Sequence, residues 1–366
     1  MRHGAHPHPA CYAPDARCAV LWPLDPICSL KRMPMHIHFC NPDIAEHPTG
    51  GNRYNAALRT AWPSNDTCTT GTAWPEAPAE ADAWLVDSLL LRDDGLLEAW
   101  ATGPPAVLTA HYLHLADPTQ HDTPAAQEEA DRLSLFGGYV APSHFVKEQL
   151  SAHSIAPRRV VVGPPGLDHT FRTGRDAAGT ALDPPAHLLS VANRFPNKQL
   201  IPCLHMLEDL RAVPWQWHVI GDETLDPGHA AAFREAVAAS PVSDRVHVQG
   251  AASAQEVRAA YARADVVLCP SRFETSGMVA REALAAGVPV LGFRVGGLPE
   301  TLGTLSDACL VPAGDFAVLR TRLHEVLTTP RLHTQLAWQA VRVSRGTPCW
   351  AETAWRIRQF VQQVAV

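Results

Sequence analysis

The chain has 366 residues, of which 46% are hydrophobic and 18% are charged, and its formal net charge is −7. That length suits two domains with a sizeable core. The acidic balance gives no general electrostatic reason to bind nucleic acid, and no apolar run reaches the roughly 20 residues that a membrane-spanning helix needs. The nine cysteines include no C-x-x-C pair, which favours reduced thiols in a cytoplasmic protein over a disulfide framework.

The first 34 residues are rich in proline, histidine and cysteine. A metal-binding tail is one interpretation, but the spacings fit no compact zinc module. A signal peptide is disfavoured because Pro23 and Pro26 interrupt the apolar stretch. We therefore expect residues 1–34 to form a disordered extension, with Met33 and Met35 as alternative starts of translation.

The next segment alternates short apolar strands with helical patterns. Strands are predicted at 36–40, 83–87, 106–110, 138–141 and 159–163, and helices at 52–58, 89–100, 124–133 and 143–150. Residues 62–82 are rich in Thr, Pro and Ala and show no clear element. The alternation implies parallel strand pairing with right-handed crossovers.

The second half of the chain is more regular, after a linker-like stretch at 164–185 that is rich in Gly and Pro. Strands are predicted at 187–191, 215–220, 245–249, 265–269, 288–291 and 308–311. Helices are predicted at 199–211, 228–239, 253–263, 278–286, 315–328, 330–343 and 350–364. This pattern is typical of a doubly wound α/β domain, whose ligand lies outside the carboxyl ends of the strands.

One segment of this second half carries the strongest functional signal. A buried strand ends at Pro270-Ser271, a helix begins near Gly277, and two carboxylates, Glu274 and Glu282, are eight positions apart. Eight helical residues span about 12 Å, which can place one acid near each end of a nucleotide-sugar. Backbone N–H groups at a helix start bind phosphates, and glycine allows a close approach. Surface acids on an ordinary strand–loop–helix unit would give the same spacing.

The surrounding motifs resemble the donor site of glycosyltransferase family 4, whose members are retaining enzymes with the two-domain GT-B fold. The matching motifs are Pro270-Ser271, Glu274 to Glu282, Ala285-Ala286-Gly287-Val288-Pro289-Val290 and Gly296-Gly297-Leu298-Pro299-Glu300. The resemblance covers about residues 35–364. It implies an α/β chain of two Rossmann-like domains that face a central cleft. The implied segments are an acceptor-side domain at 35–170, a nucleotide-sugar-binding domain at 183–345, and a last helix at 349–366 that crosses back to the first domain.

The resemblance also implies roles for individual residues. Glu282 would bind the ribose hydroxyls, and Glu274 would face the donor sugar. The implied phosphate contacts come from the helix start, at Ser276, Gly277, Met278 and Val279. Arg194 and Lys198 match a basic loop that clamps the departing diphosphate, although their separation is shorter than the commonest form and Asn193 stands where a Gly is usual. Outside this context, two such cations would be solvated loop residues.

The first half supplies the facing wall of the implied site. Gly50 and Gly51 follow the first strand, where the family often carries a Gly-rich loop near the donor phosphate and sugar. His111 follows the strand 106–110 and matches a histidine that approaches the transferred sugar, and His114 is a second candidate for the cleft. Turn geometry and a strand-end hydrogen bond are the plainer explanations for these residues. The adjacent acids Glu128 and Glu129 are expected to be solvated on a helix.

The implied reaction is a glycosyl transfer of class EC 2.4. A sugar would move from a UDP-, GDP- or ADP-linked donor to a hydroxyl of a glycan, lipid or small molecule, with His111, Glu274, Arg194 and Lys198 as the catalytic residues. No cofactor or essential metal is expected, because cations and a helix end can stabilise the leaving diphosphate and no Asp-x-Asp stands at a strand end. No nucleic-acid partner is expected, and a lipid acceptor would add peripheral membrane contact.

Other interpretations remain open. A different GT-B enzyme, such as a sugar-nucleotide epimerase or a phosphorylase, would share the fold and the donor site. A catalytically inert nucleotide-sugar-binding module would also share them. A dinucleotide oxidoreductase is disfavoured because neither half opens with G-x-G-x-x-G.

Overall fold

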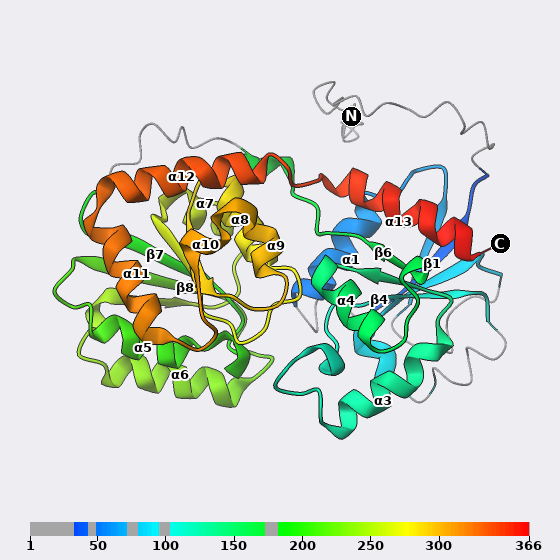
Figure 1. The fold of residues 1–366 in the computed structure, drawn as a ribbon, viewed down its shortest axis with the longest axis horizontal. Coiled ribbons are helices and arrows are strands. Elements are labelled where there is room, and N and C mark those ends of the chain that lie inside the picture. Colours follow the sequence, from blue (N-terminus) through cyan, green and yellow to red (C-terminus); the bar gives the residue numbers. More distant parts are fainter. Residues whose placement is uncertain are drawn as a thin grey trace, which may run out of the picture. The chain divides into compact units, whose positions relative to one another are not determined.

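A computed structural model describes residues 33–42, 49–71, 80–93, 95, 103–172 and 182–365. Most of the extension expected at 1–34 lies outside these residues. Two parallel sheets of six strands each account for the described strands (Figure 1). No helix in these ranges is long and apolar enough to cross a membrane.

The first sheet has the strand order β2-β1-β3-β4-β5-β6. Its strands are β1 (His36–Cys40), β2 (Thr67–Gly71), β3 (Ala83–Asp87), β4 (Ala106–Thr109), β5 (Gly138–Ala141) and β6 (Val160–Val162). The larger helices of this half are α1 (Gly50–Thr60), α3 (Pro124–Arg132) and α4 (His144–Ala152). β3, β4 and β5 are buried throughout, which explains why they are continuous apolar runs in the sequence.

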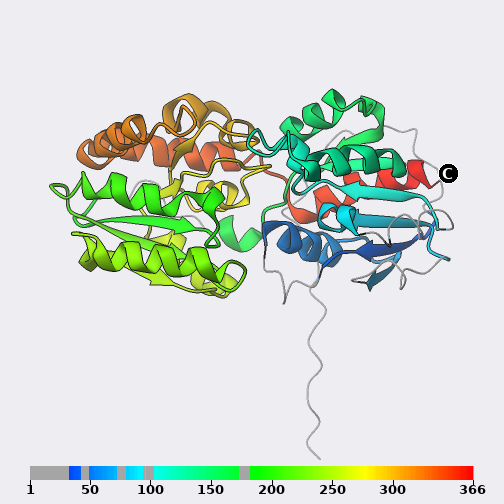
Figure 2. The same ribbon diagram turned by 90° about the horizontal axis from the view of Figure 1, so that it is seen from below.

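The second sheet has the order β12-β11-β10-β7-β8-β9, and helices cover both of its faces (Figures 1 and 2). Its strands are β7 (Ala186–Val191), β8 (Trp215–Ile220), β9 (Val246–Gln249), β10 (Val266–Cys269), β11 (Val290–Phe293) and β12 (Leu310–Val311). Its helices are α5 (Leu200–Glu208), α6 (Pro227–Ala239), α7 (Ala254–Arg263), α8 (Met278–Ala285), α9 (Leu298–Leu302), α10 (Ser306–Cys309), α11 (Phe316–Thr328) and α12 (Pro330–Ser344). The order reverses beside β7, which makes the carboxyl ends of β7 and β10 the expected ligand position.

The largest differences between prediction and structure concern three segments. β2 lies within residues 62–82, where the sequence showed no element, because its threonines and cysteine form a half-exposed edge strand rather than an apolar run. The helix predicted at 89–100 is a 3-10 helix at Ser88–Arg92, and most of the remainder lies outside the described residues. The strand predicted at 308–311 is shortened to Leu310–Val311 because α10 occupies the preceding residues.

The last helix, α13 (Trp350–Val364), packs on the first sheet rather than on the second. Its Ala354, Ile357 and Val361 are spaced for one helix face and join the same buried cluster as residues of β1, β3, β4 and β5. On the same helix, Arg358 makes two hydrogen bonds to Asp66, at 2.6 and 2.8 Å, and both side chains are almost fully buried. The carboxyl-terminal helix is thus part of the first half's core (Figure 1).

Candidate functional site

A pocket of about 510 Å³ is lined by loops and helix starts that follow strands of both sheets. The predicted site residues that line it are Gly50, Gly51, His111, Lys198, Glu274, Ser276, Gly277, Met278, Val279 and Glu282. Residues from distant parts of the chain, on both sheets, therefore share one cavity. Among the residues predicted for the site, Arg194 and the second histidine candidate, His114, do not line it.

The start of α8 places the backbone of Gly277, Met278 and Val279 at the wall of the pocket. Gly277 has φ +64°, and a Cβ there would lie 2.5 Å from Leu298 Cδ2, so both its conformation and its packing favour glycine. No side chain caps this helix. Its first N–H groups therefore stay available to an anion, at the end of the helix dipole that favours negative charge.

The Gly-Gly loop at 296–297 supports the segment that carries Glu274. Gly296 has φ +51°, and a Cβ there would lie 1.9 Å from the Glu274 carbonyl oxygen. The Gly297 N–H donates to that same oxygen at 2.8 Å. This part of the sequence motif is thus a packing requirement, because a side chain at Gly296 would displace the Glu274 backbone.

Lys198 and Glu274 form a close ion pair inside the pocket. Lys198 Nζ lies 2.5 Å from Glu274 Oε1, and the Ser271 hydroxyl donates to the same oxygen at 2.7 Å. Burial disfavours the ammonium, but the Glu274 carboxylate outweighs it and raises the pKa of Lys198. Lys198 therefore keeps its positive charge at neutral pH, although that charge is already paired with the carboxylate of Glu274.

Glu282 occupies a more apolar position on α8. Burial raises the pKa of Glu282 to about 7, while a hydrogen bond from the Tyr261 hydroxyl, at 2.9 Å, and the charge of Arg53 oppose that rise. A carboxyl group with this pKa changes its protonation state near neutral pH. Only its ionised form accepts hydrogen bonds from hydroxyl groups at both oxygens.

The position of Arg194 corrects its predicted role as a phosphate clamp. Its guanidinium is fully buried and donates to three carbonyl oxygens, those of Ala192, Val219 and Gln249, at 2.7, 3.0 and 2.9 Å. It also lies over the Phe233 ring, 5.5 Å from the centroid. Arg194 thus ties together the ends of β7, β8 and β9. The shorter separation from Lys198 was the sequence signal for this difference, since Asn193 lines the pocket in its place.

His111 is held by a chain of buried side chains from three elements of the first half. His111 Nε2 lies 2.8 Å from Asn55 Oδ1, and Asn55 Nδ2 donates to Asp87 Oδ2 at 2.5 Å. Asp87 can only accept, so the Asn55 amide must turn its oxygen toward His111. This network assigns the proton of a neutral imidazole to Nε2.

The surroundings of His111 keep it uncharged. Burial lowers the pKa of His111, against the opposing charge of Asp87. The backbone N–H groups of His111 and Tyr112 both donate to the Ser88 hydroxyl, at 3.1 and 3.2 Å, which fixes the strand end. Sequence analysis missed Asn55, Asp87 and Ser88, because only the fold brings α1 beside the ends of β3 and β4.

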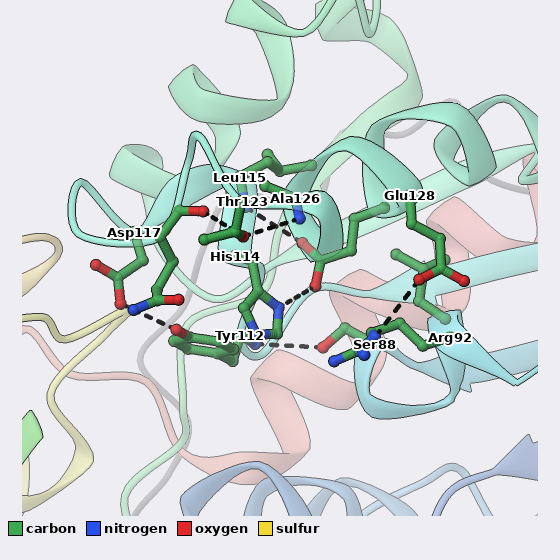
Figure 3. Close-up of polar contacts among 12 residues, drawn as sticks. Ser88, Arg92, Tyr112, His114, Leu115, Asp117, Thr123, Ala126 and Glu128 are labelled. Atoms are coloured by element: carbon green, nitrogen blue, oxygen red, sulfur yellow. Dashed lines mark hydrogen bonds and ion pairs between the residues drawn. The ribbon is translucent and has the colours of Figure 1, made fainter. Parts of the chain in front are cut away.

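A second polar cluster, which includes His114, lies near the His111 network and is drawn in Figure 3. His114 does not line the pocket, and its Nδ1 lies 2.6 Å from Glu129 Oε1. Glu129 is buried, which corrects the expectation that it is solvated. Glu128 does lie at the surface, with Arg132 and Arg92 as ion-pair partners. Tyr112 reaches the pocket, and its hydroxyl donates to Asp117 Oδ2 at 2.9 Å.

Further contacts join the two halves beside the pocket. The Ser143 hydroxyl donates to the Thr275 carbonyl oxygen at 2.6 Å, and the backbone N–H of His144 donates to Glu300 Oε2 at 2.7 Å. His144 Nδ1 lies 2.9 Å from the other Glu300 oxygen. The first turn of α4 thus binds the carboxylate that ends the Gly-Gly-x-x-Glu motif. Within the described ranges, no group of three His, Cys, Asp or Glu side chains is arranged to hold a metal ion.

Comparison with known proteins agrees with this architecture. Residues 186–329 match the family described as "Glycosyl transferases group 1". The 2-deoxystreptamine N-acetyl-D-glucosaminyltransferase of Streptomyces fradiae is 36% identical over 109 residues, which cover 30% of this chain and 26% of that protein. The D-inositol 3-phosphate glycosyltransferase of Segniliparus rotundus is 30% identical over 264 residues, 67% of this chain and 57% of the relative. The chain thus spans less than two thirds of either relative.

Solved structures show the fold more completely. HepE from Anabaena, in complex with UDP and glucose, has a TM-score of 0.73 at 15% identity and covers 90% of this chain and 99% of its own. Sucrose-phosphate synthase from Thermosynechococcus elongatus has a TM-score of 0.71 at 18% identity, with 90% and 99% covered. The predicted fold class, two doubly wound α/β domains in the GT-B arrangement, is confirmed. The predicted enzyme class, a glycosyltransferase, agrees with this family match, which spans all six strands of the second sheet.

Proposed function

We propose that the protein is a retaining glycosyltransferase of family 4, which moves a sugar from a nucleotide-sugar to an acceptor hydroxyl without a metal ion. One observation carries this proposal. Lys198, Glu274, Glu282 and the uncapped start of α8 line a single pocket at the strand ends of the group 1 domain. These are the groups that a ribose, a diphosphate and a sugar each need.

The donor would lie along this row of groups. The ionised carboxylate of Glu282 would accept hydrogen bonds from the ribose hydroxyls, and the free N–H groups of Met278 and Val279 would bind the phosphates. Glu274, already 2.5 Å from Lys198, would face the sugar. Lys198 would then lie at the boundary between sugar and phosphate, where the bond to the leaving group breaks.

The chemistry requires stabilisation of negative charge on the departing diphosphate. Preorganised cations and backbone dipoles in a water-poor site supply such stabilisation more effectively than solvent does. Lys198 and the α8 start are the groups in place for it. His111, neutral and protonated on Nε2 by its Asn55 contact, would face the transferred sugar with the lone pair of Nδ1 free to accept a hydrogen bond.

UDP-linked donors are the first class to test, because HepE, which shares the fold, was solved with UDP and glucose. The acceptors to test first are 2-deoxystreptamine and D-inositol 3-phosphate, which the names of two relatives give for those proteins. Glycan and lipid acceptors complete the panel. Retention of configuration and independence from metal are proposed from the resemblance to family 4.

A thermal-shift panel of UDP-, GDP-, ADP- and dTDP-sugars, followed by mass analysis of products with each acceptor, tests the function. The expected result is stabilisation by one nucleotide series and a product heavier than the acceptor by one sugar. Equal turnover with EDTA and with Mg²⁺ would support metal independence, and NMR of the product gives its anomeric configuration. An isomerised donor without acceptor indicates an epimerase, and binding without turnover indicates an inert module. Absence of any nucleotide binding would overturn the proposal.

A further inference from the structure

Because Arg194 does not line the pocket, the side chains that do line it include more acidic than basic groups, which disfavours an anionic ligand. The lining contains three carboxylates, Asp222, Glu274 and Glu282, against two cations, Lys198 and Arg53. Lys198 is already paired with Glu274 at 2.5 Å. A nucleotide diphosphate would bring further negative charge, so the pocket needs a second cation that is not already held in an ion pair.

Arg53 is that cation, and it comes from the other half of the protein. It lies in the first turn of α1, where its backbone N–H donates to the Thr49 carbonyl oxygen at 3.1 Å. Its side chain is exposed and lines the pocket. Among the described residues it has no hydrogen-bond or ion-pair partner, in contrast to Lys198 and Arg194.

The backbone that carries Arg53 is held firmly by the next two residues. The Tyr54 hydroxyl donates to the Gly163 carbonyl oxygen at 2.7 Å, and the Tyr54 ring packs edge-on against His111 and Trp350. Asn55 joins the chain from His111 to Asp87. Arg53 therefore projects into the pocket from a backbone position that its neighbours hold in place.

The positive charge of Arg53 acts on the end of the pocket that contains Glu282. Burial raises the pKa of Glu282 and that of Tyr261, which donates to Glu282, and the positive charge of Arg53 offsets part of each rise. Arg53 thus acts on the end of the pocket that the proposed function gives to the ribose. Lys198 and Glu274 occupy the end given to the sugar, and the phosphates of a bound donor would lie between the two cations.

We propose that Arg53 binds the diphosphate of the donor, so that the two cations on this group come from opposite halves of the protein. This inference rests on the proposed function. A guanidinium can make two parallel hydrogen bonds to phosphate oxygens, whereas the Lys198 ammonium acts as a point charge. The donor itself then links α1 of the first half to the strand ends of the second half.

Calorimetry with UDP and with uridine separates a phosphate contact from any other role of Arg53. The variants are Arg53→Gln, Arg53→Lys and a matched control, Arg59→Gln, which removes an exposed arginine from the last turn of the same helix. Arg53→Gln is expected to weaken UDP about 10- to 100-fold, as loss of hydrogen bonds to a charged group does, and to leave uridine within about twofold. Arg53→Lys should recover part of the loss, and Arg59→Gln should match the wild type.

Each possible outcome either supports or overturns the contact between Arg53 and the diphosphate. Unchanged UDP affinity in Arg53→Gln, or an equal loss for UDP and uridine, overturns the phosphate contact. Unchanged UDP affinity with a raised KM for the acceptor would instead place Arg53 at an anionic acceptor. If the wild-type protein binds none of UDP, GDP and ADP, the proposed function itself is wrong. Titration of the wild-type protein shows this without any variant. Equal melting temperatures of the ligand-free variants exclude misfolding as the cause.

Discussion

The two halves of the protein contribute different kinds of group to the same pocket. The second half places charges, Lys198, Glu274 and Glu282, on loops and a helix directly after its strands. The first half places a neutral His111, held through Asn55 to Asp87, together with Arg53 of α1. The difference suggests that the second half recognises the charged donor, while the first half orients one uncharged group and adds one charge.

A second contrast lies within one loop, between Arg194 and Lys198. Four positions separate two cations, yet one ties three strand ends together and the other faces the ligand position. Residue type alone does not distinguish these roles. The following experiments test both contrasts.

The largest expected effect is on stability, from Arg194→Met. Three carbonyl oxygens, one of them in a fully buried contact, would lose their donor, so the free energy of unfolding should fall by about 3 kcal/mol or more. Denaturant unfolding measures this loss. Arg234→Met is the control, because Arg234 is exposed and pairs with the same Glu223 that lies near Arg194. A variant of normal stability that has lost nucleotide affinity would restore Arg194 to the phosphate site.

Lys198→Ala should reduce turnover about 100-fold or more while the unfolding free energy changes little, because the charge acts on the leaving diphosphate. Lys198→Arg should also lose activity, since a planar fork replaces a compact charge beside Glu274. Steady-state kinetics measures both, with Lys147→Ala as the control on another of the three lysines. Wild-type turnover in Lys198→Arg would show that only the charge matters.

Asp87→Asn should lower turnover about tenfold, the effect of one misdirected hydrogen bond. An amide at position 87 lets Asn55 turn over and present its NH₂ group to His111, which moves the imidazole proton to Nδ1. Nitrogen NMR of the His111 ring measures the tautomer independently of activity. Asp122→Asn, at a largely exposed aspartate of the same half, is the control. An unchanged tautomer would disprove the orienting role of Asp87.

An effect similar in size to that of Asp87→Asn is the pH dependence that comes from Glu282. Burial raises its pKa to about 7, so the ionised form that accepts ribose hydroxyls dominates above that pH and is lost below it. Uridine affinity should therefore be level above pH 8 and fall about tenfold at pH 6. Uridine is the better probe because a terminal phosphate itself titrates near pH 6. Glu282→Gln should bind more weakly and show a flat profile, and the same slope in that variant would assign the titration elsewhere.

Much of the fold was predictable because its signals are local. The fully buried strand β5 is a continuous run without charged residues, and it was predicted with the bounds that the structure gives. β8, in which buried and half-buried residues alternate, was also predicted with its observed bounds. The half-exposed β2 was missed because it has no apolar run. The group of Glu274, Gly277 and Glu282 was likewise predictable, since one short segment contains a strand end, a loop and a helix start.

The remaining features depended on contacts between distant segments. The sequence by itself determined the two α/β halves, the pocket at their strand ends and ten of the residues that line it, because strand order and local motifs set these. Only the tertiary structure decided that Arg194 turns inward to three carbonyls, that Glu129 is buried against His114, and that Arg53 reaches the pocket. The direction of a charged side chain depends on which partners the fold brings within reach, and most of those partners lie 15 or more residues away in the sequence.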